Sequence, residues 1–443
     1  MAVNVATGSF NITLGAATAT VAVTDPGFLP VAGIFWWSGR SEDTDTSGSA
    51  DSHIGIGFVG DGLDQICLGH FSDDAADDTA CGYRHDDDGA ILETNAAGAE
   101  VGHASLTSWD ATGFTFTINA QFTTNFRVSY MVFGGDCNEA AASYFEPSAT
   151  GSLSVESITS EAPQIVFFIA VKDGVNADYG TTGIDFGFGA ATGAAEEATV
   201  VYGVRTALTD SDTGGYGYGA ECASRPFTTT GSMLQRIEFT SMDATGFTVN
   251  TLENNNNQVF YLALCGNFSA LVGDDVTRTD TSNFDITTTG LDPAGVMICS
   301  ACRAESTQDT MTANAMFSLG AGTGADSRTA QASSDQDAQA ASEVFTAIEH
   351  DSIYIRPDLA DGVAGLMDLV SMGSEKFTAK MDDADPDAAF FWYAAIGDAT
   401  AGAAGDLGST LAAGVGSAVA TITASSTPVP VIAHHYRMLQ GVG

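Results

Sequence analysis

Short segments in which apolar and polar side chains alternate recur along this chain. In one of them Phe114, Phe116 and Ile118 alternate with threonines, and similar segments begin at Phe247 and Phe377. A polar tip follows each segment. After the tip comes a run that is apolar at nearly every position: Val128–Phe133, Val259–Leu264 and Phe390–Ile396. Alternation with a period of two predicts a half-buried strand, whereas the continuous runs predict central strands covered on both faces.

These segments belong to a longer motif that the chain contains three times, as Ser108–Asp136, Ser241–Asn267 and Ser371–Asp398. A period of about 131 residues is too long for a solenoid repeat and predicts whole domains in tandem. Asp110–Gly113 forms the predicted turn of the first copy, because aspartate favours its first position and glycine supplies a positive φ. Lys376 replaces this glycine in the third copy, so the turn type there stays open.

Further strand patterns recur in the same order in each copy. A short leader comes first: Gly8–Leu14, Gly151–Ser157 and Ser282–Thr288. A proline-marked turn and a strongly apolar strand follow: Val31–Trp37, Gln164–Val171 and Ala294–Ser300. Next is a strand in which glycine alternates with large apolar residues, which suits a close approach to another backbone: Gly55–Asp61, Asp185–Ala191 and Phe317–Gly322. The chain is therefore predicted to be all-β, with three tandem β-sandwich, jelly-roll-like domains at 1–147, 148–275 and 276–402.

Residues 403–443 form a fourth segment. Gly416–Thr423 resembles another leader strand, but no domain follows it. Either it folds back on the third domain, or it completes a sheet in a neighbouring subunit. We expect the second arrangement, in which this C-terminal strand contacts another subunit or another protein of the same assembly, and in which Pro428 and Pro430 end the pairing.

The charge of the chain limits its partners. Only 14 lysines and arginines face 56 aspartates and glutamates, which gives a net charge of −42 over 443 residues. Such a surface repels nucleic acid and anionic membranes, so neither is expected as a direct partner. A strongly solvated surface suited to a saline or marine setting explains this composition, and binding of divalent cations by aspartate clusters is the alternative.

The most concentrated candidate chemistry is an aspartate-rich region near two histidines, His70 and His85. Its carboxylates are Asp73, Asp74, Asp77, Asp78, Asp86, Asp87 and Asp88. They are candidates for Ca²⁺, but the ligand order of an EF-hand is missing, so a solvated acidic loop is the favoured interpretation.

Other candidate motifs also favour structural interpretations. Cys299 and Cys302 have the spacing of a metal or redox pair, yet an offset of three directs strand side chains to opposite faces. The adjacent His434 and His435 are expected to diverge on a strand. Sequence motifs of known hydrolases are missing, and no pair of carboxylates is singled out for glycoside hydrolysis. We therefore predict no catalytic, cofactor-binding or metal-binding residue and no enzyme activity.

The seven cysteines are too few and too irregularly spaced for a disulfide framework. The first residues lack a basic segment followed by an apolar one, and no stretch has the length of a membrane helix. The sequence thus predicts a protein made soluble in a cytoplasm, without a signal peptide.

The tandem pattern SxDATGFTxN, followed by a polar tip and an apolar strand that ends in Gly-Gly-Asp, resembles structural proteins of tailed-phage virions, as does the apolar strand VAGIFWWSGR. The resemblance implies a non-enzymatic virion component of the head, neck or tail exterior, which forms homo-oligomers or contacts other virion proteins. It carries no catalytic residue to transfer. A virus of a marine or saline host would also account for the aspartate-rich surface.

A carbohydrate-binding or receptor-binding fibre or adhesin is the alternative function. In that case exposed aromatic side chains would stack on sugars, and the candidates are Trp36, Trp37, Trp109 and Trp392. Trp36, Trp37 and Trp392 lie inside apolar runs, however, which predicts that they are core residues. An acidic surface-layer protein or an accessory domain of an enzyme is a third possibility.

Overall fold

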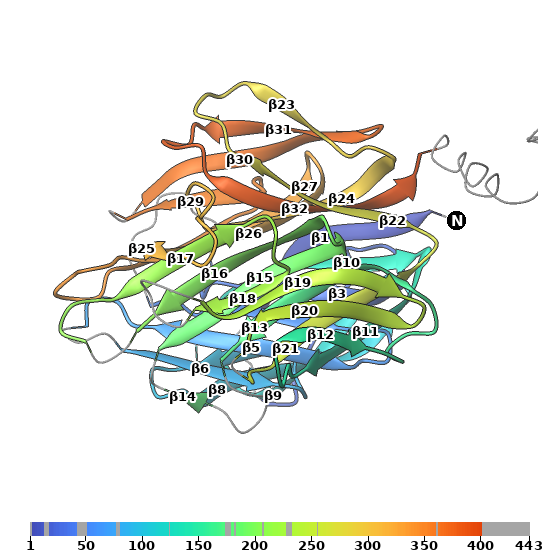
Figure 1. Cartoon of the computed structure of the whole chain (residues 1–443). Helices are drawn as coiled ribbons and strands as arrows, with labels where there is room; N and C mark the ends of the chain where they lie inside the picture. Colours follow the sequence, from blue (N-terminus) through green and yellow to red (C-terminus); the bar gives the residue numbers. More distant parts are fainter. Residues whose placement is uncertain are drawn as a thin grey trace, which may run out of the picture. The chain divides into compact units, whose positions relative to one another are not determined.

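The protein is all-β, as predicted. The computed structural model describes residues 2–12, 17–41, 51–76, 80–123, 125–172, 179–180, 183–205, 208–226, 233–254, 256–359 and 362–400. In this part of the chain every regular element is a β-strand, and the strands form six antiparallel sheets (Figure 1). None of the described elements is a helix long and apolar enough to cross a membrane.

The first repeat has one large and one small sheet. The large sheet contains, in spatial order, β1 (Val3–Ile12), β10 (Phe126–Gly135), β3 (Pro30–Trp37), β4 (Gly55–Val59), β5 (Gln65–Ser72) and β6 (Cys81–Asp86). The small sheet contains β2 (Thr20–Val23), β9 (Gly113–Ala120), β8 (Glu100–Asp110) and β7 (Ile91–Thr94).

The second repeat has the same topology. Its large sheet contains β11 (Cys137–Phe145), β21 (Val259–Gly266), β13 (Pro163–Val171), β15 (Ile184–Gly193), β16 (Glu196–Val204) and β17 (Thr213–Tyr218). Its small sheet contains β12 (Gly151–Val155), β20 (Gly246–Glu253), β19 (Met233–Asp243) and β18 (Ala223–Pro226).

The third repeat follows the same order again. Its large sheet contains β22 (Ser269–Val276), β32 (Phe390–Ala399), β24 (Leu291–Ser300), β26 (Ala315–Gly324), β27 (Ser327–Asp335) and β28 (Val344–Glu349). Its small sheet contains β23 (Asn283–Thr287), β31 (Lys376–Asp383), β30 (Gly362–Gly373) and β29 (Tyr354–Asp358). Figure 1 shows this small sheet lying over the large sheet of its own repeat.

The repeated turn motif forms the same hairpin in all three repeats. Asp110 pairs with Gly113, Asp243 with Gly246, and Gly373 with Lys376. Each hairpin has two register shifts at matching places, one of them just after Leu106, Phe239 or Leu369. The lysine of the third copy therefore does not alter the hairpin. Phe114 and Phe247, which begin the alternating strands, are fully buried.

The turn glycines serve a purpose other than the predicted one. Gly113 and Gly246 are not among the residues with positive φ. A Cβ atom at Gly113 would lie 1.9 Å from the carbonyl oxygen of Val23, and one at Gly246 would lie 2.0 Å from that of Val155. These glycines are needed because the neighbouring strand passes too closely for any side chain.

The glycine-alternating strands are explained in the same way, as predicted. A Cβ atom at Gly57 would lie 2.0 Å from the Ala90 carbonyl oxygen, and one at Gly320 would lie 2.3 Å from that of Ile353. The glycines therefore let the small sheet pack directly against the backbone of the large sheet.

The large sheets are buried on both faces. One face packs on the small sheet of its own repeat, and the other contributes to a single cluster that contains Trp36, Phe167 and Trp392 from the three repeats. Ring contacts cross the repeat boundaries: Phe58 lies 6.3 Å from Phe188, which in turn lies 5.3 Å from Trp392. This double burial explains why the central strands are apolar at every position.

Neighbouring repeats are also joined by short added strands. β14 (Tyr179–Gly180) follows β13 in sequence but pairs with β6 of the first repeat. β25 (Thr312–Ala313) precedes β26 but pairs with β17 of the second repeat. Two of the three large sheets thus carry a strand from the next repeat along the chain.

The strand pairing corrects the predicted repeat boundaries. The strand Cys137–Phe145 pairs with β21 of the second repeat, although it precedes the boundary expected at 147. The strand Ser269–Val276 pairs with β32 of the third repeat, although the third domain was expected to begin at 276. The second and third repeats therefore each start about one strand earlier, because their first strands follow directly on the last strand of the preceding repeat.

The predicted leaders are not equivalent to one another. Gly8–Leu14 overlaps β1 of a large sheet, whereas Gly151–Ser157 and Ser282–Thr288 overlap β12 and β23 of small sheets. The true counterpart of β12 in the first repeat is Thr20–Val23, a strand of only four residues that pairs with β9.

Met1–Gly402 forms one compact unit. The predicted C-terminal strand at Gly416–Thr423 and the adjacent His434 and His435 lie outside the described residues.

Candidate functional site

A polar pocket lies between the first two repeats. It has a volume of about 310 Å³ and is lined by β5, by the turn after β6 and by β11. Its lining residues are Leu63, Asp64, Gln65, Ile66, Asp87, Asp88, Ala142, Ser143 and Tyr144. The side chains of Asp64, Asp87 and Asp88 give the pocket a negative charge, and Tyr144 is 40% exposed at its edge.

This lining favours neutral, hydroxyl-rich or cationic ligands. Carboxylates accept hydrogen bonds from hydroxyl groups and attract cations, and an exposed tyrosine ring offers an apolar face. Anionic ligands are repelled. The pocket is thus a candidate for sugar or cation binding, and its location at a repeat boundary could not be foreseen from linear spacing.

A second group of acidic residues adjoins this pocket. Asp86 ends β6, and Glu100 and His103 lie on β8. One potential ligand atom from each of these residues lies within 4.8 Å of the others, and the same holds for Asp86, Asp87 and Asp88. Asp86 and His103 are buried, whereas Glu100 is partly exposed. The sequence indicated Asp86 but gave no sign of Glu100 or His103, because these come from another strand.

The aspartate-rich region predicted from the sequence does not form one cluster. Asp73 and Asp74 follow β5, whereas Asp86–Asp88 lie at the opposite end of the β5–β6 hairpin, about 17 Å away at about 3.4 Å per residue. The Asp74 side chain accepts a hydrogen bond from the backbone N–H of Val344 in the third repeat at 3.0 Å. Asp77 and Asp78 lie outside the described residues.

His70 and His85, predicted to accompany these aspartates, are core residues. The His70 ring lies 5.0 Å from that of Phe186, and the His85 ring lies 5.6 Å from that of Phe260. Burial lowers the pKa of His70 well below its usual value, and the nearby His85 and Lys172 lower it further. His70 is therefore neutral, and it contributes to the contact between the first two repeats.

The cysteine pair Cys299 and Cys302 is split between two cores, as predicted. Cys299 belongs to the cluster shared by the three repeats, and Cys302 belongs to the interior of the third sandwich. Burial raises the pKa of Cys302 to about 12, so its thiol is protonated and unreactive at neutral pH. All seven cysteines are free and buried.

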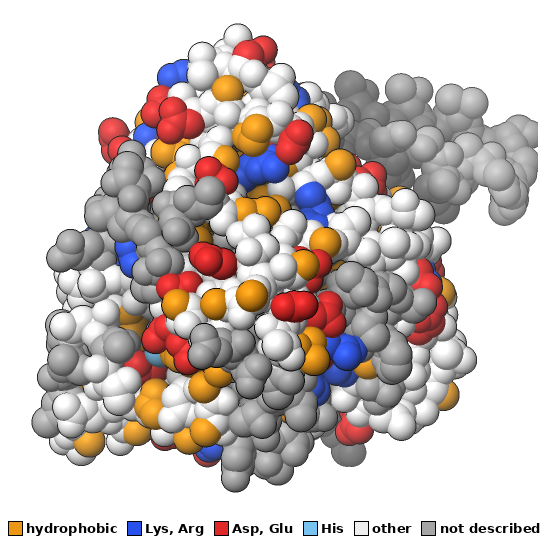
Figure 2. Space-filling model, turned by 90° about the vertical axis from the view of Figure 1, so that its left-hand side faces the viewer, with side chains coloured by type: hydrophobic (Ala, Val, Ile, Leu, Met, Phe, Trp, Pro, Cys, Tyr) orange, Lys and Arg blue, Asp and Glu red, His pale blue; other side chains and the backbone are white. Residues whose placement is uncertain are grey.

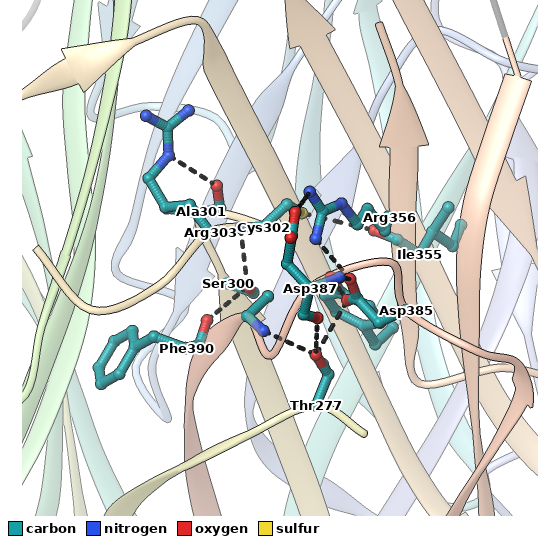
Figure 3. Close-up of polar contacts among 12 residues, drawn as sticks. Thr277, Ser300, Ala301, Cys302, Arg303, Ile355, Arg356, Asp385, Asp387 and Phe390 are labelled. Atoms are coloured by element: carbon teal, nitrogen blue, oxygen red, sulfur yellow. Dashed lines mark hydrogen bonds and ion pairs between the residues drawn. The ribbon is translucent and has the colours of Figure 1, made fainter. Parts of the chain in front are cut away.

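Figure 3 shows the polar network around Asp385, within the predicted polar tip of the third repeat. The buried Asp385 carboxylate accepts hydrogen bonds from the Tyr354 hydroxyl at 2.8 Å and the Thr277 hydroxyl at 2.9 Å, and it pairs with Arg356. Arg356 also contacts Asp387 at 2.9 Å. Every one of these contacts fixes the tip to β29 and to the strand end at Thr277, so this network is structural.

A second buried carboxylate lies where all three repeats meet. Asp335, at the end of β27, accepts a hydrogen bond from Ser72 of the first repeat at 2.7 Å and pairs with the hydroxyl of Tyr202 in the second repeat. Thr213 donates to its backbone oxygen at 2.8 Å. Burial raises the pKa of Asp335 to about 6, and the two hydroxyl donors oppose this effect. Sequence reasoning missed Asp335 because each partner belongs to a different repeat.

A third buried carboxylate, Glu197, lines a cleft of about 560 Å³ on the second repeat together with Glu238. Burial raises the pKa of Glu197 to about 8. Its carboxylate accepts a hydrogen bond from the backbone N–H of Phe239 at 2.6 Å. Two carboxylates on one cleft are a pattern of glycoside hydrolases. The bond to Phe239, however, gives Glu197 a structural role.

The predicted core tryptophans are indeed buried. Trp36, Trp37 and Trp392 are at most 2% exposed, which leaves them no free ring face for a sugar. Trp109 is partly exposed, and its indole N–H donates to the Gly60 carbonyl oxygen at 3.0 Å.

Comparison with known proteins gives no match: no family model, curated protein or solved structure is similar to this chain.

Proposed function

We propose that this protein is a non-enzymatic structural component of a larger assembly, in which one chain supplies three β-sandwiches as a single building block. The observation that carries the proposal is the cluster shared by the three large sheets. Three sandwiches joined through a common core have fixed relative positions, as a building block requires, whereas flexibly linked binding modules need no shared core.

The buried polar groups support the same function. Asp335 joins three repeats, and Asp385 holds a loop tip to the third sandwich. Glu197 holds a strand of the second small sheet. A catalytic group must touch its substrate, whereas these carboxylates are occupied by hydrogen bonds within the protein.

The finer proposal is a component of a tailed-phage particle, located on the exterior of the head, neck or tail. It is supported by the resemblance of the repeated motif to phage structural proteins, and by a net charge of −42 that suits a particle surface in a saline medium. Acidic side chains are scattered between uncharged ones on the face shown in Figure 2, which suits solvation better than docking of nucleic acid.

The test is to compare the full chain with a variant that ends at residue 402, using mass photometry over a range of protein concentrations. We expect the full chain to form oligomers, or to bind purified particles that lack the protein. The shortened chain should keep its circular dichroism spectrum, because the compact unit ends at Gly402, but should assemble more weakly. Unchanged assembly of the shortened chain would contradict a role for residues 403–443. A full chain that neither assembles nor binds particles would contradict the building-block proposal.

The absence of enzyme activity is tested on Glu197 and Glu238, which line the same cleft. We expect no hydrolysis of glycan or peptide substrates by the wild-type protein. Turnover that disappears in both Glu197→Gln and Glu238→Gln would identify this cleft as an active site and would overturn the non-enzymatic proposal.

Carbohydrate or receptor binding is the second candidate function, favoured by the pocket with Asp87, Asp88 and Tyr144. Glycan-array binding that is lost in Tyr144→Ala, but kept in Tyr218→Phe, which alters a tyrosine outside the pocket, would favour this alternative. Equal binding by both variants would exclude the pocket as the receptor site.

A further inference from the structure

We propose that Asp86, Glu100 and His103 bind one divalent transition-metal ion of the zinc class, which joins β6 to β8 in the first sandwich. This site goes beyond the structural function proposed above. Three features support it: the chemistry of the three donors, a buried nitrogen without a hydrogen-bond partner, and the residues at the matching place in the other two repeats.

The three donors converge from two strands of different sheets. Asp86 comes from β6 of the large sheet, and Glu100 and His103 come from β8 of the small sheet. Their ligand atoms lie within 4.8 Å of one another. One imidazole and two carboxylates are typical ligands of Zn²⁺ and related ions, whereas Ca²⁺ and Mg²⁺ prefer oxygen ligands alone.

The independent sign of a ligand is the Nε2 atom of His103. The residue is 7% exposed, and this nitrogen is buried without a hydrogen-bond partner. It points towards Asp86, whose Oδ1 atom lies 3.8 Å away. That distance is too long for a hydrogen bond, but two ligands bound to one ion at about 2.1 Å lie roughly 3.4–4 Å apart.

Gly89 lets the His103 ring pack closely against the backbone beside Asp88. A Cβ atom at Gly89 would lie 1.8 Å from His103 Nε2. Any other residue at this position would displace the imidazole of His103 from its place beside Asp86.

In the second repeat, an arginine side chain occupies the matching place. The register shift at His103 corresponds to the shift at Arg236, and Gly89 corresponds to Glu221. Arg236 contacts Glu221 at 2.7 Å and Glu253 at 3.2 Å. A positive charge between two carboxylates is therefore compatible with this place in the fold, and in the first repeat a metal ion would supply it.

In the third repeat, an apolar side chain occupies the same place. Leu366 lies at the corresponding register shift and is buried in an apolar cluster. A histidine with an unpartnered nitrogen beside two carboxylates is thus specific to the first repeat.

Arg84 neutralises only part of the negative charge around the site. Its guanidinium contacts Oε2 of Glu100 at 3.3 Å, and the N–H of Asp88 donates to Oδ1 of Asp86 at 2.7 Å. Each carboxylate has a second oxygen, and Asp87 and Asp88 add negative charge next to the site. Arg84 therefore orients Glu100 and only partly neutralises the cluster.

The experiment measures Zn²⁺ binding to the full chain by calorimetry, and Co²⁺ binding by visible absorption. Excess Mg²⁺ and high salt suppress binding of ions to the acidic surface. We expect one tight site per chain, weakened more than about tenfold by His103→Ala and by Asp86→Asn. Circular dichroism checks that each variant is folded, and the second variant serves if the first does not fold.

Two controls give the experiment its specificity. Asp73→Asn removes an acidic residue at the other end of the β5–β6 hairpin and should leave the tight site unchanged. Cys67→Ser should also leave it unchanged, although Cys67 pairs with Asp86 in the strand ladder. The proposal is overturned if Zn²⁺ binds only weakly and at many places, if His103→Ala and Asp86→Asn leave the tight site intact, or if Cys67→Ser abolishes it.

Discussion

Asp335 is a single carboxylate that links the three repeats and makes their association depend on pH. Its pKa is raised from 3.8 to about 6 by burial, so the folded protein holds a proton that the unfolded chain releases between these values. Asp335 makes its full contribution to the free energy of unfolding below pH 4. This contribution falls by about 3 kcal/mol in total as the pH rises through 6. Asp335→Asn keeps a hydrogen-bonding amide and removes this dependence.

We expect the free energy of unfolding of Asp335→Asn, relative to wild type, to increase by about 1 kcal/mol from pH 5 to pH 7 in urea titrations. The exposed Asp326→Asn removes the same charge and serves as the control. A pH-independent difference between Asp335→Asn and wild type would show that Asp335 is ionised in the folded protein at both pH values.

At the scale of residues, the sequence was informative where a side chain's neighbours are local. Phe114, Phe247 and Trp392 lie in apolar patterns, and all three are buried as predicted. His103 and Asp335 gave no signal, because their partners come from other strands or other repeats. Linear spacing carries no information about such contacts.

At the scale of elements, one polar side chain holds the two sheets of each sandwich together. It comes from the same strand position in each repeat and bonds to the backbone at a matching register shift. Gln65 accepts from the N–H of Leu106 at 2.8 Å and donates to its carbonyl oxygen at 3.3 Å. Glu197 accepts from the N–H of Phe239, whereas Arg328 donates to the carbonyl oxygen of Leu369 at 2.7 Å. The position is conserved in function, while its chemistry differs between repeats.

Replacing Glu197 with glutamine should reproduce the bonding of the first repeat. The pKa of Glu197 is raised by burial to about 8, so its stabilising contribution is present at low pH and is lost as the pH rises from about 4.5 through 8. We expect Glu197→Gln to match wild type near pH 4 and to become more stable than wild type as the pH rises, by up to about 5 kcal/mol at pH 9. Denaturant midpoints across this pH range provide the measurement.

The reverse substitution is the matched control. Gln65→Glu places the carboxylate in the first sandwich and should destabilise the protein increasingly as the pH rises above the ordinary glutamate pKa of 4.5. If Glu197→Gln were less stable than wild type throughout the pH range, the ionised carboxylate would be the form that holds Phe239.

The elements themselves were largely predictable, but their assignment to sheets was not. Alternation and glycine spacing indicated the hairpins and the central strands, because these follow local rules. The predicted leader Gly8–Leu14 was matched to the wrong counterparts, since β1 and β12 have similar patterns but belong to different sheets. Strand partners depend on long-range packing that a pattern of two-residue period does not specify.

At the scale of the whole molecule, the repeats indicated three related sandwiches, whereas their shared core was not predicted. The residues of this core look in sequence like the interiors of three separate domains, because both faces of each large sheet are apolar. The consequence is that the repeats are expected to unfold together rather than as independent domains.

The net charge acts on this unit as a whole. Fourteen cationic side chains cannot offset 56 acidic ones, so the folded state is subject to self-repulsion that salt screens over a Debye length of about 30 Å at 0.01 M and 3 Å at 1 M. We expect the melting temperature to rise over this range of NaCl, and to rise equally in KCl because screening does not depend on the cation. A flat salt dependence would contradict the self-repulsion.

At matched ionic strength, Ca²⁺ should stabilise the protein no more than Mg²⁺ does. A much larger effect of Ca²⁺ would instead identify specific calcium sites among the aspartate-rich loops.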